Sequence, residues 1–426
     1  MFDRDRWQEI INAIKTNKLR SALTAFGVFW AIFMLIVMTG SGNGLKNGIT
    51  EGFKDFATNS GFMWANTTTK AHEGYNRGRN WQINNKDIEE IKDQVAGIDV
   101  ISPRLNGWNL RNGENIVRGE RSAAFNVMGD YPSYRKIDPC TMVWGRYIND
   151  EDILHKRKVC IIGEKVYEIM FDEDEDPVGT YIRVNGVYFM VVGVFKSNNP
   201  NINIGSNKKE TVYLPFTSMQ QTFNYGDQVH FFGITAQKGT KISKVIDSIK
   251  PILQKNHKIA PKDDEAIGQV DLENEIKGMF YMFLGIDILI WVVGIGTLIA
   301  GAIGISNIML IVIKERTKEI GIQRAIGARP KIIIGQILME SVFLTTIAGF
   351  LGLAFGTIVL YLVDMAVDTS IANAGPDDQT FFMNPEIGLP IAISALLMLI
   401  TVGFIAGLVP ALNAVKIKPI DALRHE

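Results

Sequence analysis

Four long stretches of the chain are almost entirely apolar. They cover residues 21–40, 279–313, 332–362 and 387–410. Asp287 and Glu340 are the charged residues within them. A helix over each stretch, rising about 1.5 Å per residue, would cross a hydrocarbon core of roughly 30 Å. The pattern therefore predicts transmembrane helices at about 21–40, 285–313, 334–362 and 387–410; buried helices of a soluble core are the disfavoured alternative.

The segment between the first two stretches, residues 41–278, has a different composition. About a quarter of its residues are charged, which is typical of a soluble domain. Short apolar runs predict strands at 98–101, 115–117, 124–128, 158–162, 181–184, 188–195 and 229–235. Amphipathic periodicity predicts helices at 87–95 and 242–255, and Asn185-Gly186 is a hairpin signal. We therefore expect an α-helical membrane protein with an α+β domain, rich in antiparallel sheet, inserted after the first transmembrane helix.

Lysine and arginine are unevenly distributed among the segments that flank the apolar stretches. They are concentrated in the first 20 residues, in the 314–331 connection and in the tail, whereas the 363–386 connection has none. Cytoplasmic loops carry an excess of Lys and Arg. We therefore expect both termini and the 314–331 connection in the cytoplasm, with residues 41–278 and the acidic 363–386 connection outside.

The first 20 residues carry a helical pattern of their own. Trp7, Ile10, Ile11 and Ile14 are spaced at i, i+3, i+4 and i+7, which is one face of an amphipathic helix. This spacing predicts a helix on the inner membrane surface before the first span, within residues 1–40. A cleaved signal peptide is the alternative, but its basic region would be unusually long.

The composition of the whole chain excludes several classes of protein. With 44 Lys and Arg against 45 Asp and Glu, the formal net charge is −1, so no nucleic-acid partner is expected. Cys140 and Cys160 are too few for a disulfide-rich scaffold, and whether they pair is left open. The five histidines form no metal-binding spacing, and the acidic run 172–176 lacks the pattern of a calcium loop. We expect no catalytic residues, no metal and no cofactor in this chain.

The segment after the second apolar stretch, KERTKEIGIQRAIGARP at Lys314–Pro330, combines many charges with apolar spacing. Gly321, Gly327 and Pro330 punctuate it, which predicts a short helix bounded by turns. An ordinary basic loop that only sets topology is the alternative, and charge does not separate the two.

This segment closely resembles the E-R-T-x-E-I-G-I-x-x-A-[IV]-G-A signature of the MacB/FtsX-type ABC transporter permeases. The residues concerned are Glu315, Arg316, Thr317, Glu319, Ile320, Gly321, Ala325, Gly327 and Ala328, with Arg324 at a variable position. In this family the signature forms the coupling helix that docks on a cytoplasmic ATPase. The resemblance implies that role for residues of about 314–328.

The similarity extends along most of the chain, through the opening at 17–24, the region 138–195 and the ending at 410–426. It implies a porter-like external domain with an inserted β-rich part at about 107–228, followed by an FtsX-like domain at 279–426. Some MacB proteins carry a fused ATPase domain. Because no G-x-x-x-x-G-K-[ST] loop occurs in this sequence, we expect ATP and Mg²⁺ on a separate ATPase subunit.

Small residues in the apolar stretches indicate close helix packing, either within the chain or in a dimer. They are Gly294, Gly301, Gly304, Gly352, Gly356, Gly403 and Gly407. Glu340 is an intramembrane carboxylate, for which a functional role and a buried hydrogen-bonded role both remain open. The second span is expected to begin as early as Asp271, as a stalk into the external domain.

The family resemblance implies a permease of the mechanotransmission type, which does not pass its substrate through a membrane channel. A second permease subunit, identical or different, and the cell inner membrane are its expected surroundings. Tripartite efflux of antibiotics or peptides, with a periplasmic adaptor and an outer-membrane exit protein, is favoured. Lipoprotein release and FtsX-like control of a cell-wall hydrolase are alternatives, and a membrane-anchored binding protein is a further one. The substrate is left open.

Overall fold

The computed structural model describes residues 18–110, 113–199, 202–373 and 382–416. The predicted N-terminal amphipathic helix and the 419–426 ending therefore lie outside the described residues. The chain divides into two compact units, which we treat separately. A helical unit comprises Met1–Ile49 with Tyr281–Glu426, and an α+β unit comprises Thr50–Phe280. The α+β unit thus begins at Thr50 and not at the predicted residue 41.

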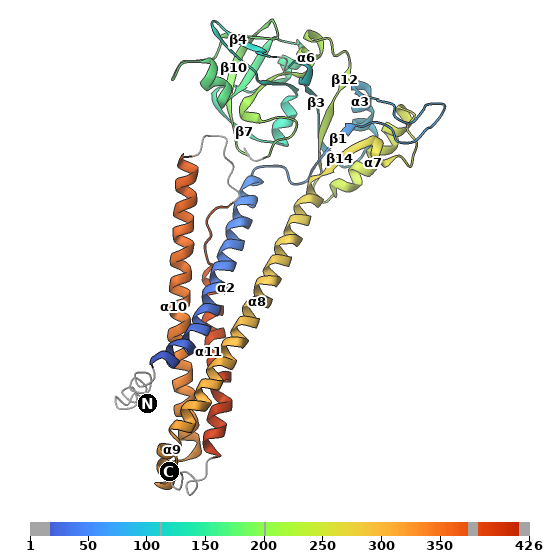
Figure 1. Cartoon of the computed structure of the whole chain (residues 1–426). Coiled ribbons are helices and arrows are strands. Elements are labelled where there is room, and N and C mark those ends of the chain that lie inside the picture. Colours follow the sequence, from blue (N-terminus) through green and yellow to red (C-terminus); the bar gives the residue numbers. More distant parts are fainter. Residues whose placement is uncertain (1–17, 111–112, 200–201, 374–381, 417–426) are drawn as a thin grey trace. The chain divides into compact units, whose positions relative to one another are not determined.

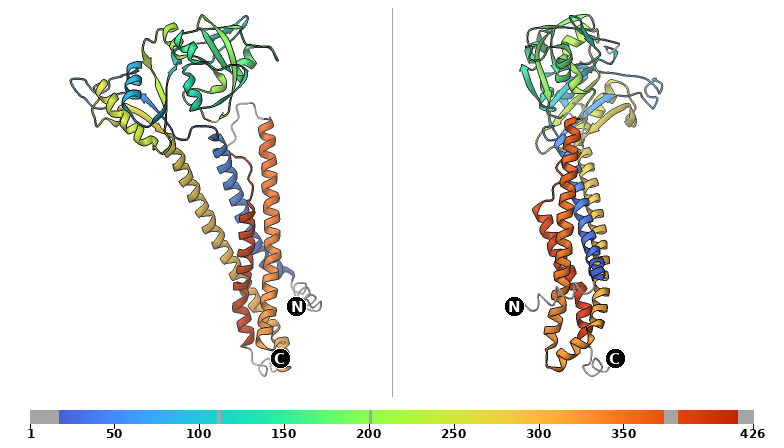
Figure 2. Two further views of the ribbon diagram at one scale, coloured as in Figure 1. Left: turned by 180° about the vertical axis from the view of Figure 1, so that it is seen from behind. Right: turned by 60° about the vertical axis from the view of Figure 1, so that its left-hand side comes forward.

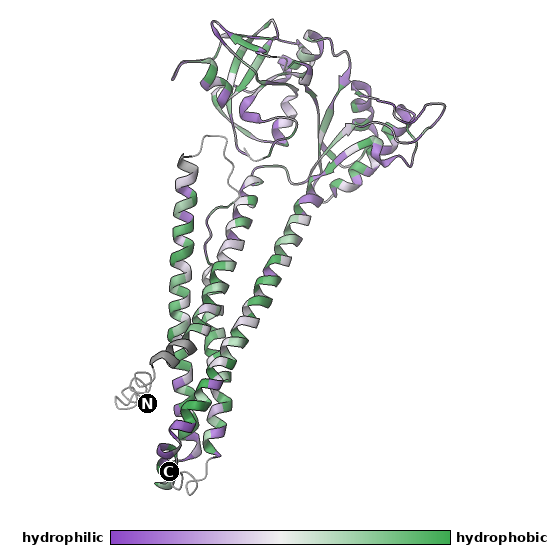
Figure 3. Ribbon diagram, in the orientation of Figure 1, coloured by the Kyte–Doolittle hydropathy of each residue, from purple (hydrophilic) through white to green (hydrophobic). Residues whose placement is uncertain are grey.

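The helical unit is built from α2 (Lys18–Gly52), α8 (Leu272–Glu315), α9 (Thr317–Ala325), α10 (Pro330–Asn373) and α11 (Leu389–Val415) (Figure 1). Within the described residues, four of these helices are long and apolar enough to cross a membrane, and they are the predicted four. All four have a predominantly apolar colouring in Figure 3. Each is longer than predicted, because a helix satisfies its own backbone and continues past the apolar stretch. The start of α8 at Leu272 agrees with the expected stalk.

Glycines bring α10 against α2. A Cβ added at Gly352 would lie 2.6 Å from the carbonyl oxygen of Phe29, and one at Gly356 would lie 2.7 Å from the Ile36 side chain. Next to them, the Phe355 ring packs on Phe33 at 5.6 Å between centroids. Small residues are therefore required at this seam, since any side chain would force the two helices apart.

Two further glycine seams complete the helical unit. Gly403 and Gly407 of α11 lie against Thr345 and Ser341 of α10, and the Ser341 hydroxyl donates to the Gly403 carbonyl at 2.9 Å. Figure 2 shows α10 and α11 side by side from both directions.

In α8, Gly294 and Gly301 face α2, where a Cβ on Gly294 would lie 2.6 Å from Leu35. Gly304 differs from the other predicted packing glycines, because no described residue lies within 4 Å of its Cβ position.

The outer end of α2 carries polar residues that hold the segment before α11. Asn43 and Asn47, one turn apart, donate to the carbonyls of Glu386 and Asn384 at 3.1 and 3.0 Å. The Phe382 ring covers Gly44, where a Cβ would meet it at 2.7 Å. Of the predicted 363–386 outer connection, the first part is helical to Asn373, while Asp377 and Asp378 lie outside the described residues.

The α+β unit contains one large mixed sheet. Its strands are β1 (Ser60–Ala65), β3 (Ile98–Asn106), β4 (Ile116–Arg118), β5 (Arg121–Ala123), β6 (Asn126–Asp130), β7 (Cys140–Gly145), β8 (Val159–Gly163), β9 (Tyr181–Val184), β10 (Val187–Ser197), β11 (Thr211–Pro215), β13 (Phe231–Ala236) and β14 (Ile267–Asp271). A separate small pair joins β2 (Ile83–Asn84) to β12 (Gln228–Val229). The helices are α3 (Asn85–Gln94), α4 (Asp150–Leu154), α5 (Glu164–Met170), α6 (Phe216–Thr222) and α7 (Ile242–Asn256).

The long strand β3 joins two parts of the large sheet. The strand order is β14-β1-β13-β3-β6-β11-β8-β10-β9-β4-β5, with β7 on β10. On one side of β3, strands β14, β1 and β13 pack on α7, which buries an apolar face that includes Ile246 and Ile249. On the other side, β4 to β11 form the β-rich part, within the predicted 107–228 insertion. Two parallel pairs, β10–β8 and β11–β6, interrupt an otherwise antiparallel sheet.

The predicted strands and helices of residues 87–255 are present, with shifts of a few residues. The hairpin at Asn185-Gly186 has positive φ at both positions, +45° and +87°, as a tight turn between β9 and β10 requires. Strands β1, β2, β5, β7, β11 and β14 and helices α4 to α6 were not predicted. Cys140 and Cys160 are both free thiols in this structure, and Cys160 is buried in β8.

A buried ion pair connects the two parts of the sheet. Arg104 at the end of β3 binds Asp130 of β6 through Nε and Nη2, the latter at 2.9 Å from Oδ2. Both side chains are fully buried, and the guanidinium lies 3.7 Å from the centre of the Tyr134 ring. Arg104 also donates to the carbonyl of Ile204 at 3.4 Å. The pair thereby fixes β3, β6 and the segment before β11 to one another.

We expect Arg104→Ala to destabilise the α+β unit by about 3–5 kcal/mol, because it leaves the Asp130 carboxylate buried without a partner. Arg121→Ala is the matched control, since its ion pair with Asp172 is exposed and should be worth less than about 1 kcal/mol. Urea unfolding of the full chain, followed by tryptophan fluorescence, measures both. Equal losses in the two variants would contradict this role of the buried pair.

Candidate functional site

The short helix α9 lies between two long helices and is bounded by sharp turns. Helix α8 ends at Glu315, Arg316 is the N-cap, and α9 then runs from Thr317 to Ala325. Gly327 follows with φ +102°, a conformation that favours glycine, and Pro330 begins α10. The structure therefore forms a helix within the segment that carries the signature.

The apolar residues of α9 divide between two faces. Ile320 is 8% exposed and packs with Ile313, Ile333 and Ile337 in the core of the helical unit, and Gly321 beside it is also buried. Ile322 and Ile326 are 42% and 82% exposed, and Ala325 between them is exposed too. The apolar spacing noted in the sequence of this segment does not assign its residues to a face. The structure separates them into an inner face and an outer face.

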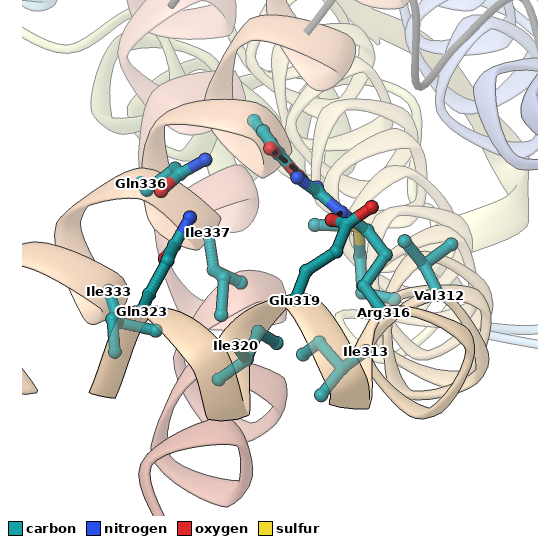
Figure 4. Close-up of a pocket in the computed structure, with 11 residues that line it drawn as sticks. Val312, Ile313, Arg316, Glu319, Ile320, Gln323, Ile333, Gln336 and Ile337 are labelled. Carbon is teal, nitrogen blue, oxygen red and sulfur yellow. Dashed lines mark hydrogen bonds and ion pairs between the residues drawn. The ribbon is translucent and has the colours of Figure 1, made fainter. Parts of the chain in front are cut away.

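An ion pair fixes the start of α9 to α10. Arg316 donates from Nη1 to Oε1 of Glu340 at 3.0 Å and from Nε to Oε2 of Glu319 at 2.9 Å (Figure 4). The Glu340 side chain is only 10% exposed. Burial alone would lower the pKa of Arg316, but the bonds to Glu319 and Glu340 raise it above its ordinary value, so the guanidinium stays charged. Of the two roles left open for Glu340, the structure supports the buried hydrogen-bonded one.

A small cavity adjoins this ion pair (Figure 4). Its lining comes from α8, α9, α10 and Arg316 and comprises Met309, Val312, Ile313, Arg316, Glu319, Ile320, Gln323, Ile333, Gln336, Ile337 and Glu340. Its volume of about 20 Å³ is enough for one water molecule and too small for a larger ligand. The cavity is therefore too small for a substrate, and the ion pair beside it stabilises the contact between α9 and α10.

The far end of α9 is held as well. The Arg324 guanidinium donates to the carbonyl of Val415, at the C-terminal end of α11, where a cation also complements the helix dipole. The Thr317 hydroxyl donates to the Ile313 carbonyl of α8 at 3.1 Å. Helix α9 is thus attached to α8 through the chain, to α10 through Arg316 and to α11 through Arg324. The remaining predicted residues, Glu315 and Ala328, lie at the two ends of the segment, exposed and half-buried respectively.

Within the described residues, no group of three His, Cys, Asp or Glu side chains is arranged to hold a metal ion. The acidic run 172–176 is instead engaged by arginines: Arg118 binds Glu175, and Arg121 binds Asp172.

Comparison with known protein families agrees with this architecture. Residues 21–252 match the MacB-like periplasmic core domain, and residues 291–419 match the FtsX-like permease C-terminal domain. The first match alone spans more than half of the chain. The chain belongs to the MacB/FtsX-type ABC permease family. It is accordingly a multi-pass membrane protein whose α+β unit is extracytoplasmic.

Individual relatives of this permease are distant but align over nearly all of it. The macrolide export ATP-binding/permease protein MacB of Bdellovibrio bacteriovorus is 28% identical over 418 residues, which cover 97% of this chain and 60% of that protein. The pyoverdine export ATP-binding/permease protein PvdT of Pseudomonas entomophila is 25% identical, covering 96% and 58%. The chain thus spans about 60% of the length of these relatives.

Two solved extracytoplasmic regions are similar to about half of this chain at low identity. The periplasmic region of MacB from Actinobacillus actinomycetemcomitans has 17% identity and a TM-score of 0.42, covering 54% of this chain and 97% of that one. The extracellular domain of the Gram-positive transporter YknZ has 17% identity and a TM-score of 0.40, covering 50% and 100%.

We expect Arg316→Ala to destabilise the helical unit by about 2 kcal/mol or more, because it removes the cation that the mostly buried Glu340 carboxylate binds. Glu319→Ala is the control, since Glu319 is 63% exposed and its loss should cost less than about 1 kcal/mol. Thermal unfolding of the chain in lipid nanodiscs measures both. The double variant Arg316→Met with Glu340→Met should regain part of the lost stability. The stabilising role of the Arg316–Glu340 ion pair is contradicted if Arg316→Ala is as stable as Glu319→Ala.

Proposed function

We propose that the chain is the permease subunit of an ABC transporter of the mechanotransmission type. ATP, with Mg²⁺, is bound and hydrolysed by a partner ATPase subunit, and α9 is the helix on which that subunit docks. The supporting observation is the outer face of α9. Ile322, Ala325 and Ile326 are exposed on a connection whose excess of Lys and Arg favours the cytoplasm. Large apolar side chains grouped on a water-facing surface are typical of a protein interface.

The attachments of α9 support the transmission of motion. Because Arg316 and Arg324 tie α9 to α10 and α11, a displacement of α9 by the ATPase would move these helices together. Helix α8 continues from the same corner without a break to Leu272, over roughly 66 Å at 1.5 Å per residue. Strand β14 directly precedes α8 and pairs with β1 in the large sheet. Within the described residues, α8 therefore follows directly on β14 and leads directly to Arg316, the N-cap of α9.

Export is the direction of transport that the relatives support, since those named above are macrolide and pyoverdine exporters. We therefore favour efflux over lipoprotein release or control of a cell-wall hydrolase. The proposal places the chain in the inner membrane with both termini cytoplasmic. It includes a second permease subunit, a periplasmic adaptor and an outer-membrane exit protein.

The docking role of α9 predicts that Ile322→Ser with Ile326→Ser abolishes recovery of an ABC ATPase with the tagged chain. Each buried isoleucine contributes about 1.5–3 kcal/mol to an interface, so losing two weakens binding at least about a hundredfold. Affinity purification from the native membrane, with the ATPase identified by mass spectrometry, is the measurement.

Leu412→Ser is the matched control, because Leu412 is equally apolar, 47% exposed and lies in the last turn of α11, near α9. It should retain the ATPase. The proposal fails if no ABC ATPase accompanies the unaltered chain, or if the double variant retains it as fully as Leu412→Ser does.

A further inference from the structure

The α+β unit contains a polar cavity that the proposed function does not use. It lies where the end of β3, the short helix η1 (Trp108–Leu110), the start of β6 and the segment before β11 meet. Its volume is about 260 Å³, below the roughly 300 Å³ at which pockets for drug-sized ligands begin. The lining residues are Asn106, Gly107, Trp108, Asn126, Val127, Gly205, Ser206, Asn207 and Glu210.

Trp108 provides a flat aromatic wall. The residue is 69% exposed, although it is the largest apolar group of the cavity. Behind it lies the ring of His230, parallel within 6° at 6.1 Å between centroids. His230 is fixed in turn, because its Nδ1 accepts from the backbone N–H of Asn106 at 2.9 Å and the Tyr225 ring meets it edge-on at 5.4 Å. The indole is therefore supported on one face and open on the other.

The polar lining is dominated by amides. The Asn106 amide donates to the Gly205 carbonyl at 3.0 Å, and the Asn207 side-chain oxygen accepts from the backbone N–H of Lys209 at 3.2 Å. These bonds orient both amides. The Glu210 carboxylate is 2.7 Å from the Lys165 ammonium through Oε1 and retains further acceptor capacity. An amide presents a donor and an acceptor together, as does a hydroxyl, so the wall matches a ligand that has several hydroxyl groups.

The cavity is preformed by its backbone. A Cβ at Gly107 would lie 2.6 Å from the Val127 carbonyl oxygen, and Gly205 has φ +86°, so both positions require glycine. The buried Arg104 holds the preceding Ile204 carbonyl at 3.4 Å. The wall therefore needs no rearrangement before a ligand enters, which reduces the entropy cost of binding.

We propose that this cavity binds a carbohydrate, with one pyranose ring stacked on the open face of Trp108 and its hydroxyls bonded to the amides and to Glu210. The C–H face of a sugar ring carries partial positive charge and is attracted to the negative face of an indole. A phosphate is disfavoured because the carboxylate of Glu210 faces the cavity. A purely apolar ligand is disfavoured because most of the lining is polar. The proposal is independent of ATPase coupling.

The test uses the full chain in phospholipid nanodiscs, since many detergents carry sugar headgroups. Binding of maltose, a neutral glucoside, and of chitobiose, an N-acetylated sugar, is followed by saturation-transfer NMR and by titration up to about 10 mM. We expect binding of at least one of them. Trp108→Ala and Glu210→Gln should each weaken that binding about tenfold or more, whereas Trp108→Phe should preserve most of it.

Tyr188→Ala is the control, because Tyr188 is an exposed aromatic of the same unit that does not line the cavity. It should leave binding unchanged. The response to maltose against chitobiose tells which kind of sugar is recognised. The proposal is overturned if neither sugar binds, or if Trp108→Ala binds as tightly as the unaltered chain while its unfolding curve is unchanged.

Discussion

The ion pair between Arg316 and Glu340 is the interaction on which the proposed mechanism depends most. A carboxylate near the end of a transmembrane helix is costly unless a cation meets it. Arg316, the N-cap of α9, supplies that cation, and its bond to Glu319 orients the guanidinium. The same bond that stabilises Glu340 therefore also fixes the angle at which α9 leaves α8. With that angle set, Ile320 points into the bundle, and Ile322 and Ile326 remain on the outside.

The glycine seams have a complementary role. They let α2 approach both α8 and α10 closely and let α11 approach α10, so the helices move as a packed set. The α+β unit is made rigid in a comparable way, by the Arg104–Asp130 pair across β3 and β6. These features suit a protein that transmits force: closely packed helices, a continuous helix α8 and a sheet held together by a buried ion pair. Within the apolar stretches 21–40, 279–313, 332–362 and 387–410, the charged side chains are Asp287 and Glu340, which does not suit a polar pore.

The membrane spans could be predicted from the sequence because charged side chains are costly in the hydrocarbon core. Long stretches without charged residues therefore indicate spans. The sequence predicted β9 and β10 because an Asn-Gly turn separates two clear apolar runs. It missed β11, TVYLP, and β1, SGFMWA, since strands buried on both faces do not alternate. The Arg316–Glu340 contact joins positions 24 residues apart, and the cavity at Trp108 joins three separated segments. Neither the Arg316–Glu340 contact nor the cavity produces a local sequence pattern. A charged residue, Glu340, within an apolar stretch nevertheless indicated that this position is special.

The continuity of α8 is the central claim of the mechanism, and Gly285 offers a direct test, since no described residue lies within 4 Å of its Cβ position. Gly285→Pro breaks the helix through its own backbone, without a clash against a neighbouring element, and Gly285→Ala is its control. Spin labels at Tyr181→Cys and Asp368→Cys, with Cys140→Ser and Cys160→Ala, report the distance between the two units in the complex with its ATPase. We predict that ATP shifts this distance in the unaltered chain and in Gly285→Ala, but not in Gly285→Pro. An equal shift in Gly285→Pro would contradict the account.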